Sequence, residues 1–161
     1  MTNNFSTRKT NLVNWSPTFA CGIQLVDEQH KSLIDMINEM YNHVSGNPME
    51  EREYFNSVIK KAVNYIKIHF ATEEKLMIAT KFSGYAKHRR EHELFILKVI
   101  EKNHEFNAAT SRLTLSDFIH FLKDWVLSHV AVVDKVYFNY FRAIATRKAD
   151  GKLSITSADV R

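Results

Sequence analysis

Apolar side chains recur along most of the chain at alternating spacings of three and four residues, which is the period of helices that pack in a bundle. The pattern covers four stretches, which lie at about residues 23–45, 49–80, 85–106 and 114–145. Gly46-Asn47-Pro48 and Ser83-Gly84 separate the first three, and Thr114 or Ser116 is placed to cap the last. Four long helices joined by short loops predict an all-α, up-down-up-down four-helix bundle.

Most positions predicted to face the core are apolar, and they include Val44 on the first stretch and Val132 and Val136 on the last. The same inward rows also hold ionisable residues, namely His30, His69, Glu73, His88, His92 and His129. A buried carboxylate without a partner costs on the order of several kcal/mol, and each buried imidazole needs partners for both ring nitrogens. A metal centre is the simplest way to satisfy all of these groups together.

Two pairs in this set have the spacing of side chains that share one face of a helix. Glu73 follows His69 by four residues, and His92 follows His88 by four. Each pair therefore projects two donor groups toward the same region of the bundle.

Asp134 follows His129 by five residues, which on a regular helix places the two side chains about 140° apart around the axis. Both side chains reach one site only if the helix widens between them. We therefore predict a π-type bulge or a comparable distortion at this point. On the spacing alone, an exposed surface aspartate remains the favoured interpretation of Asp134.

Five imidazoles and one or two carboxylates are more ligands than a single ion accepts, so the pattern predicts two metal ions bridged by carboxylates. Imidazole with oxygen ligation suits iron, and zinc and copper less exclusively. Each ligating imidazole is expected to use its second ring nitrogen on a nearby polar group. His43, His104 and His120 lie off the inward rows and are predicted to be surface residues.

Composition supports the helical interpretation. The 161 residues include 4 Gly and 2 Pro, too few for the frequent turns of a strand-rich sandwich or barrel. A single cysteine, Cys21, excludes a disulfide framework and a four-cysteine zinc site, and we expect it to be a small buried side chain rather than a redox thiol. The length suits one domain.

The formal net charge is +4, and the basic residues are dispersed, so we predict no nucleic-acid surface. The densest basic runs, Lys87 with Arg89 and Arg90 and the group at Arg147, Lys148 and Lys152, are interpreted as solvated faces. No stretch has the about 18–20 apolar residues of a membrane span, and residues 1–16 lack the apolar core of a secretory signal. A cytoplasmic location is therefore expected.

Four motifs in order along the chain resemble the hemerythrin family in its bacterial single-domain form, over about residues 12–142. They are Val26-Asp27-Glu28-Gln29-His30 with Leu33, His69-Phe70-Ala71-Thr72-Glu73-Glu74 with Met77, His88-Arg89-Arg90-Glu91-His92, and Trp125 followed by His129 and Asp134. The resemblance implies a single domain, with an N-terminal arm at 1–22, a bundle at 23–146 and a polar tail at 147–161. One departure is Phe82-Ser83, where the family usually has Tyr-Pro; this should alter the loop but not the ligands.

The resemblance also implies a cofactor of two iron ions (Fe²⁺/Fe³⁺) joined by an oxo or hydroxo bridge. One iron would be held by His88, His92 and His129, and the other by His30 and His69, with an open position on the second. Glu73 and Asp134 would bridge the two, so the resemblance places Asp134 in the site. Five apolar residues match the family's oxygen pocket, namely Phe70, Trp125, Val126 and Val130, with Leu33 as a lid.

The implied function is reversible binding of dioxygen for storage, delivery or sensing. The alternative is a di-iron enzyme, such as an oxidase, a peroxidase or a nitric-oxide-handling protein. Oxygen-activating bundles use carboxylate-rich sites with paired Glu-x-x-His motifs, whereas this chain offers five histidines and two carboxylates, which favours binding. A structural or zinc-binding bundle is a third class. The sequence leaves any protein partner unidentified.

Overall fold

The computed structural model describes residues 10–108 and 113–149, with side chains as far as residue 144. No strand occurs in these ranges. The helices are α1 (Gln24–Tyr41), α2 (Pro48–Ala79), α3 (Tyr85–Asn107), α4 (Leu115–Ser128) and α5 (Asp134–Ala149), with a short helix η1 (Pro17–Phe19) and a turn η2 (His129–Val133). None of the helices described is long and apolar enough to cross a membrane.

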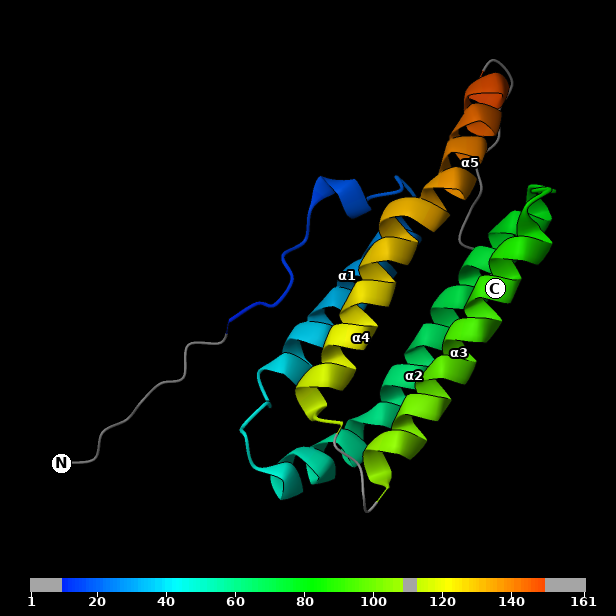
Figure 1. The fold of residues 1–161 in the computed structure, drawn as a ribbon. Helices are drawn as coiled ribbons and strands as arrows, with labels where there is room; N and C mark the ends of the chain where they lie inside the picture. Colours follow the sequence, from blue (N-terminus) through cyan, green and yellow to red (C-terminus); the bar gives the residue numbers. More distant parts are fainter. Residues whose placement is uncertain (1–9, 109–112, 150–161) are drawn as a thin grey trace.

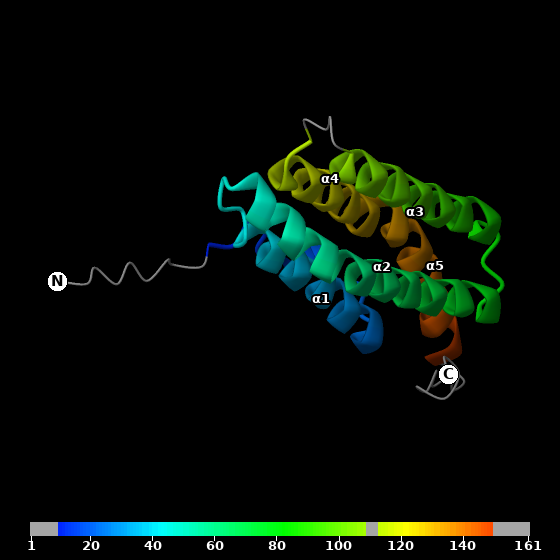
Figure 2. The ribbon, with the colours of Figure 1, turned by 90° about the horizontal axis from the view of Figure 1, so that it is seen from below.

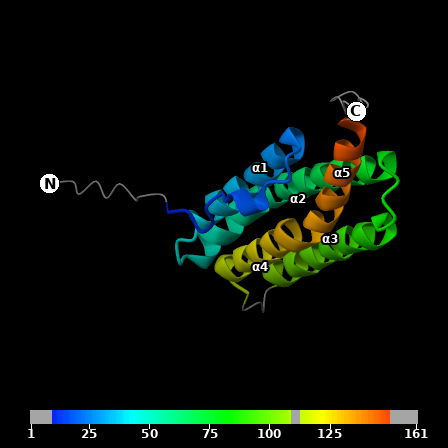
Figure 3. The ribbon, with the colours of Figure 1, turned by 90° about the horizontal axis from the view of Figure 1, so that it is seen from above.

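The long helices form the predicted up-down-up-down bundle (Figure 1). α1 and α3 each pack against α2 and α4, and Figure 2 shows α2 lying between α1 and α3. The end of the N-terminal arm lies against α1 (Figure 3), where the side chain of Asn38 accepts from Val13 N at 2.9 Å and donates to Val13 O at 2.8 Å. The buried Asn38 amide therefore satisfies both backbone hydrogen-bonding groups of Val13 in the arm.

The last long helix contains the predicted distortion. η2 is a π-helical turn that joins α4 to α5 without a break in the chain's helical course, and Asp134 N donates to His129 O, five residues earlier. This wider turn accommodates one extra residue per turn. The sequence pattern therefore predicted both the place and the kind of irregularity.

Val132 and Val136 are not core residues, so that part of the prediction is wrong. Each is 63% exposed, and the buried face of α5 is formed by Tyr137 and Phe138. The extra residue in η2 shifts the inward row by one position, which is about 100° on a regular helix. Val44 is also exposed, because α1 ends at Tyr41.

Local capping residues explain where α2 and α4 begin. Asn47 accepts from Met49 N at the start of α2, with Pro48 in the first turn. Thr114, rather than Ser116, caps α4: its hydroxyl accepts from Asp117 N at 3.1 Å, and Asp117 Oδ2 accepts from Thr114 N at 3.0 Å.

The apolar core is divided into two clusters. The larger includes Leu33, Phe70 and Val130, and the smaller includes Val26, Leu76 and Tyr137. Along α1, α2 and the α4–α5 helix, the residues between these two sets are His30, Glu73 and Asp134 respectively. A polar layer therefore crosses the bundle between two apolar layers.

Candidate metal centre

All seven residues predicted as metal ligands lie in this polar layer, and each is buried. Their exposed fractions range from 0% to 5%; they are His30 on α1, His69 and Glu73 on α2, His88 and His92 on α3, His129 in η2 and Asp134 at the start of α5. The structure thus brings together side chains that span more than 100 residues of sequence.

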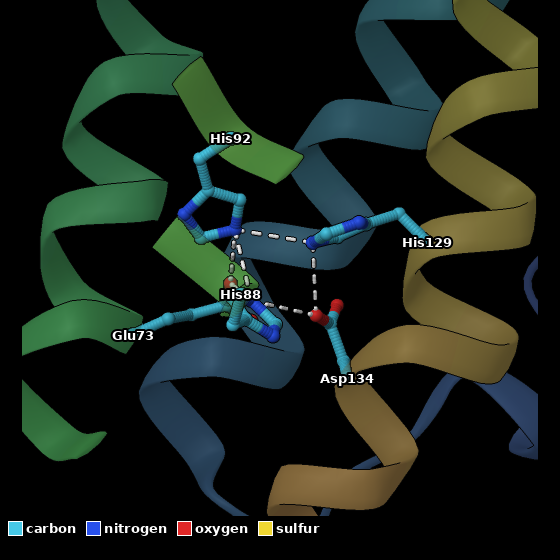
Figure 4. A group of neighbouring side chains, drawn as sticks. All are labelled: Glu73, His88, His92, His129 and Asp134. Carbon is cyan, nitrogen blue, oxygen red and sulfur yellow. Dashed lines mark hydrogen bonds and ion pairs between the residues drawn. The ribbon is translucent and has the colours of Figure 1, made fainter. Parts of the chain in front are cut away.

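The donor atoms fall into two groups, within each of which all atoms lie within 4.8 Å of one another. One group has five members, Glu73, His88, His92, His129 and Asp134. The other has four members, His30, His69, Glu73 and Asp134. Figure 4 shows the five side chains of the first group pointing toward one another. The two carboxylates belong to both groups.

Glu73 divides its two oxygens between the groups. Oε2 lies 3.3 Å from His92 Nε2 and 3.6 Å from His88 Nε2. Oε1 lies 3.7 Å from the Nε2 atoms of His30 and His69. A carboxylate that offers one oxygen to each of two donor groups has the arrangement of a bridging ligand.

Asp134 is arranged in the same way from the opposite side. Its Oδ1 lies 3.1 Å from His129 Nε2 and 3.4 Å from His88 Nε2, whereas Oδ2 lies 3.6 Å from His30 Nε2. The π-turn makes this possible, because it returns Asp134 to the face of the helix that carries His129.

Five donor atoms at the centre have no hydrogen-bond partner among the residues that the structure describes. Among the described residues, no hydrogen bond reaches His30 Nε2, either oxygen of Glu73 or either oxygen of Asp134, although all of these atoms are buried. Native proteins rarely leave buried polar atoms unsatisfied. Two divalent or trivalent cations with imidazole and carboxylate ligation would satisfy all five atoms, so the residues fit a two-metal centre.

Three imidazoles are oriented by hydrogen bonds at Nδ1, as expected for metal ligands. His30 Nδ1 lies 3.2 Å from Phe19 O, His69 Nδ1 lies 3.2 Å from Gln29 Oε1, and His92 Nδ1 lies 3.0 Å from Glu74 Oε1. Each contact directs the other ring nitrogen, Nε2, toward the centre.

Sequence reasoning did not identify these orienting partners. Gln29 Nε2 donates to Thr72 Oγ1, which in turn donates to Ile68 O, so the amide oxygen of Gln29 is held toward His69. A signal was available: Gln29 lies three residues after Val26, and Thr72 three after His69, both at helix-period positions. The Phe19 carbonyl belongs to the backbone and carries no such signal.

The carboxylates are held in their ionised, ligating form. Burial raises the pKa of Glu73, but His69 and His30 outweigh it and keep the pKa well below its usual range. Burial and the charge of Glu73 raise the pKa of Asp134, but His129 and His30 lower it overall. Two negative charges thus remain at the centre at neutral pH.

The imidazoles near the smaller donor group differ from each other. Burial lowers the pKa of His30, but Asp134 and Glu73 raise it overall to about 9. Burial dominates at His69 and lowers its pKa to about 4. The carboxylates thus outweigh burial at His30, whereas burial outweighs them at His69.

The remaining histidines and the cysteine lie where the sequence predicted. His43, His104 and His120 are exposed. Cys21 is 2% exposed, and burial raises the pKa of its thiol. It packs in the smaller apolar cluster, as expected of a small buried side chain.

Comparisons with known proteins identify the family of this chain. The family model for the hemerythrin HHE cation binding domain matches residues 21–150. A bacteriohemerythrin from Stenotrophomonas maltophilia is 33% identical over 133 residues, which is 82% of this chain and 83% of the relative.

The chain belongs to the hemerythrin family.

Other hemerythrins agree with this assignment. A bacteriohemerythrin from Methylococcus capsulatus is 27% identical over 78% of this chain and 94% of its own length. The crystal structure of a wild-type hemerythrin has a TM-score of 0.66 and 25% identity, covering 80% of this chain and 96% of the other. The family and the helical bundle are therefore established from both sequence and fold.

The loop before α3, where this chain has Phe82-Ser83, is closed by aromatic packing. The ring of Phe82 lies 5.4 Å from that of Tyr137 and 5.1 Å from that of Tyr140, centroid to centroid. A Cβ on Gly84 would lie 2.6 Å from the Phe82 ring, so glycine permits this close approach. His88, one turn into α3, still reaches the five-donor group.

Stacked rings cover one side of the two donor groups. Phe70 stacks on His92 with 3.7 Å between centroids, and Trp125 stacks on His129 at 4.2 Å. Phe95 also stacks on Trp125, at 3.6 Å. Three further buried residues predicted for an oxygen pocket belong to the same apolar cluster, namely Leu33, Val126 and Val130.

Proposed function

We propose that the seven buried residues hold two iron ions with an oxo or hydroxo bridge, and that the protein binds dioxygen reversibly. One observation carries the proposal: Glu73 and Asp134 each present one oxygen to a group of three histidines and the other to a group with two. Family membership supports iron as the metal, and the mixed imidazole and carboxylate set is compatible with it.

The unequal donor sets favour different roles for the two ions. His88, His92 and His129 would hold one iron, which receives five protein donors with the carboxylates. His30 and His69 would hold the other, which receives four. The bound irons would supply an accessible coordination position at the four-donor ion and the electrons that dioxygen binding requires.

The protein's own contribution is to fix the donors and exclude water. The Nδ1 contacts of His30, His69 and His92 hold these rings in place, so that little reorganisation accompanies binding. The apolar residues of the pocket would keep water and charged groups away from the centre, namely Leu33, Phe70, Trp125, Val126 and Val130. We further propose that the arm and the bundle act as one domain.

The same features argue against the alternative of a di-iron enzyme. A carboxylate-rich site is the pattern of oxygen-activating bundles, whereas five of the seven residues here are histidines. The stacked rings of Phe70, Trp125 and Phe95 also fill one side of the centre, which suits a diatomic ligand better than an organic substrate.

A spectroscopic cycle tests the proposal. The iron-loaded protein would be reduced under argon, exposed to air, and returned to argon under vacuum. We expect a visible charge-transfer band that forms with oxygen and fades when oxygen is removed. A band that decays directly to the oxidised spectrum, faster when an organic substrate or peroxide is added, would favour the enzyme. Zinc in place of iron after expression in iron-rich medium would favour a structural bundle.

A further inference from the structure

A groove on the outer face of the bundle comes close to the proposed metal centre. It lies between α2 and α3, which run side by side in Figures 1 and 2, and has a volume of about 530 Å³. Phe70 and His92 line it, although each is at least 95% buried, so they form its floor. Lys67, Arg89 and Arg90 are among its other lining residues.

His92 connects this groove to the centre. Its Nε2 faces inward, 3.3 Å from Glu73 Oε2 and 3.1 Å from His129 Nε2. Its Nδ1 faces Glu74 Oε1 at 3.0 Å, and the Glu74 side chain is 23% exposed in the groove. A single imidazole ring, stacked on Phe70, therefore separates the groove from the donor atoms that would hold iron.

The charge of the groove is positive where a partner would meet it. Glu93 forms ion pairs with Arg89 at 3.1 Å and with Arg90 at 3.5 Å, and the Glu74 carboxylate contacts His92. Both carboxylates of the groove therefore already have partners within the protein. Lys67 makes no ion pair with any residue that the structure describes. A second hollow shares Lys67 and adds Lys60, which extends the basic wall along α2.

An exposed apolar rim lies beside these charges. Leu97 on α3 is 58% exposed and lines the groove together with the half-buried Ile96. Three cationic side chains line the groove against two carboxylates, each of which already has a partner within the protein, so the groove carries a net positive charge. A small apolar spot beside such a charge suits transient docking of an acidic protein. A nucleic acid would need a longer basic stripe with exposed aromatic side chains.

We propose that this groove docks a small acidic protein carrying a one-electron redox centre, and that His92 carries the electron inward. The inference rests on the proposed function, because an oxygen-binding di-iron centre that oxidises to two Fe³⁺ must be reduced before it can bind dioxygen again. Two molecules of reduced carrier each lose one electron, and the two Fe³⁺ ions each gain one to become Fe²⁺. No other bond need form or break.

Reduction kinetics test the proposal. The probe is a flavodoxin, a small acidic protein with one flavin, reduced to its hydroquinone and mixed anaerobically with the oxidised, iron-loaded protein. Reversing the charge of Lys67 (Lys67→Glu) should slow reduction about 10-fold at low ionic strength, and added salt should slow the wild-type reaction and narrow this difference. The matched control is Lys61→Glu, an exposed position on α2 that does not line the groove, and its rate should stay within about 2-fold of wild type.

Two further measurements separate this proposal from the proposed function. Dithionite, which needs no protein docking, should reduce wild type and both variants at equal rates and restore the oxygen-dependent band. Titration of the protein with oxidised flavodoxin, followed by amide NMR shifts, should perturb α2 and α3 around Lys67 and weaken in Lys67→Glu. Equal flavodoxin rates for Lys67→Glu and Lys61→Glu, or shifts confined to another face, would overturn the docking site even if the band is intact. If the protein reduced with dithionite forms no band when oxygen is added, the proposed function itself would be contradicted.

Discussion

Glu73 and Asp134 occupy equivalent positions in the polar layer, but different local helix geometry places them there. Glu73 lies one regular helical turn after His69, so its direction follows from ordinary helix geometry. Asp134 reaches the layer only because the π-turn supplies one extra residue. Both carboxylates then offer one oxygen to each donor group, which is the residue-level basis of the two-metal proposal.

His69 is the most direct single-residue test of the smaller donor group. We expect His69→Ala to reduce the iron content from two per folded chain toward one, because only one imidazole would remain there. His120→Ala removes an exposed histidine and should keep two. Elemental analysis on chains shown to be folded by circular dichroism measures both; two irons in His69→Ala would contradict the assignment.

Leu33 tests the proposed lid. It is buried at 4% exposure, one turn after His30, and Leu33→Ala should speed oxidation of the oxygen-bound protein several-fold by admitting water. Leu115→Ala is the control: it also creates a core cavity, at a cost of about 2–5 kcal/mol, but lies 14 residues before His129, about 20 Å along the helix. The decay rate of the oxygen-dependent band is measured. If the band decays equally faster in both variants, the cause is the loss of stability, and Leu33 is not a lid.

The sequence was sufficient for the inward histidines and Glu73, because helix period alone places them on the core rows. It was insufficient for Asp134, whose spacing from His129 points away from the site on a regular helix, and here the family resemblance supplied the assignment. The contacts of Gln29 and Glu74 with imidazole nitrogens depend on how neighbouring helices are rotated, which a single sequence does not specify.

At the scale of elements, the irregular turn η2 determines which face of α5 is buried. The sequence predicted the distortion, but the predicted core row continued through it at the regular helical spacing. Val132 and Val136 were therefore assigned to the core. In the structure both are 63% exposed, and Tyr137 and Phe138 fill the core instead. A local change in helical period thus shifts every inward position that follows it.

Single-residue deletions test this explanation in metal-free protein. Deleting Val132 should convert η2 into a regular turn while Tyr137 and Phe138 keep their buried positions, so the melting temperature should not fall. Deleting the equally exposed Val136, in a regular helix, would turn Tyr137 outward and bury Asn139. We expect this to lower the melting temperature by at least about 5 °C. Similar losses in both deletions, measured by thermal denaturation, would contradict the register shift.

At the scale of the whole molecule, a charged layer lies between two apolar clusters. The bundle class and the four long helices were predictable because few glycines and prolines interrupt the apolar period. The path of the N-terminal arm was not, since it depends on the Asn38 amide and on a backbone carbonyl of Phe19 that reaches His30. The arm therefore belongs to the architecture of the site as well as to the fold.

Metal binding should stabilise the whole fold, because iron would satisfy five buried atoms that no hydrogen bond from the described residues reaches. Anaerobic reconstitution with Fe²⁺ should raise the melting temperature by about 10 °C, the shift expected when free metal exceeds its dissociation constant about 1,000-fold. Mg²⁺, which prefers oxygen ligands and retains water, is the control and should have little effect. Equal melting temperatures with and without Fe²⁺ would argue against the proposed centre.

Oxygen stoichiometry tests the central claim most directly. The reduced, iron-loaded protein would be equilibrated with a measured amount of dioxygen in a closed cell, degassed, and cycled again while dissolved oxygen is recorded. Reversible binding at a two-iron centre predicts uptake of one dioxygen per two irons, return of the same amount on degassing, and unchanged capacity over successive cycles. Oxygen that is consumed without being returned, or uptake unrelated to the iron content, would contradict it.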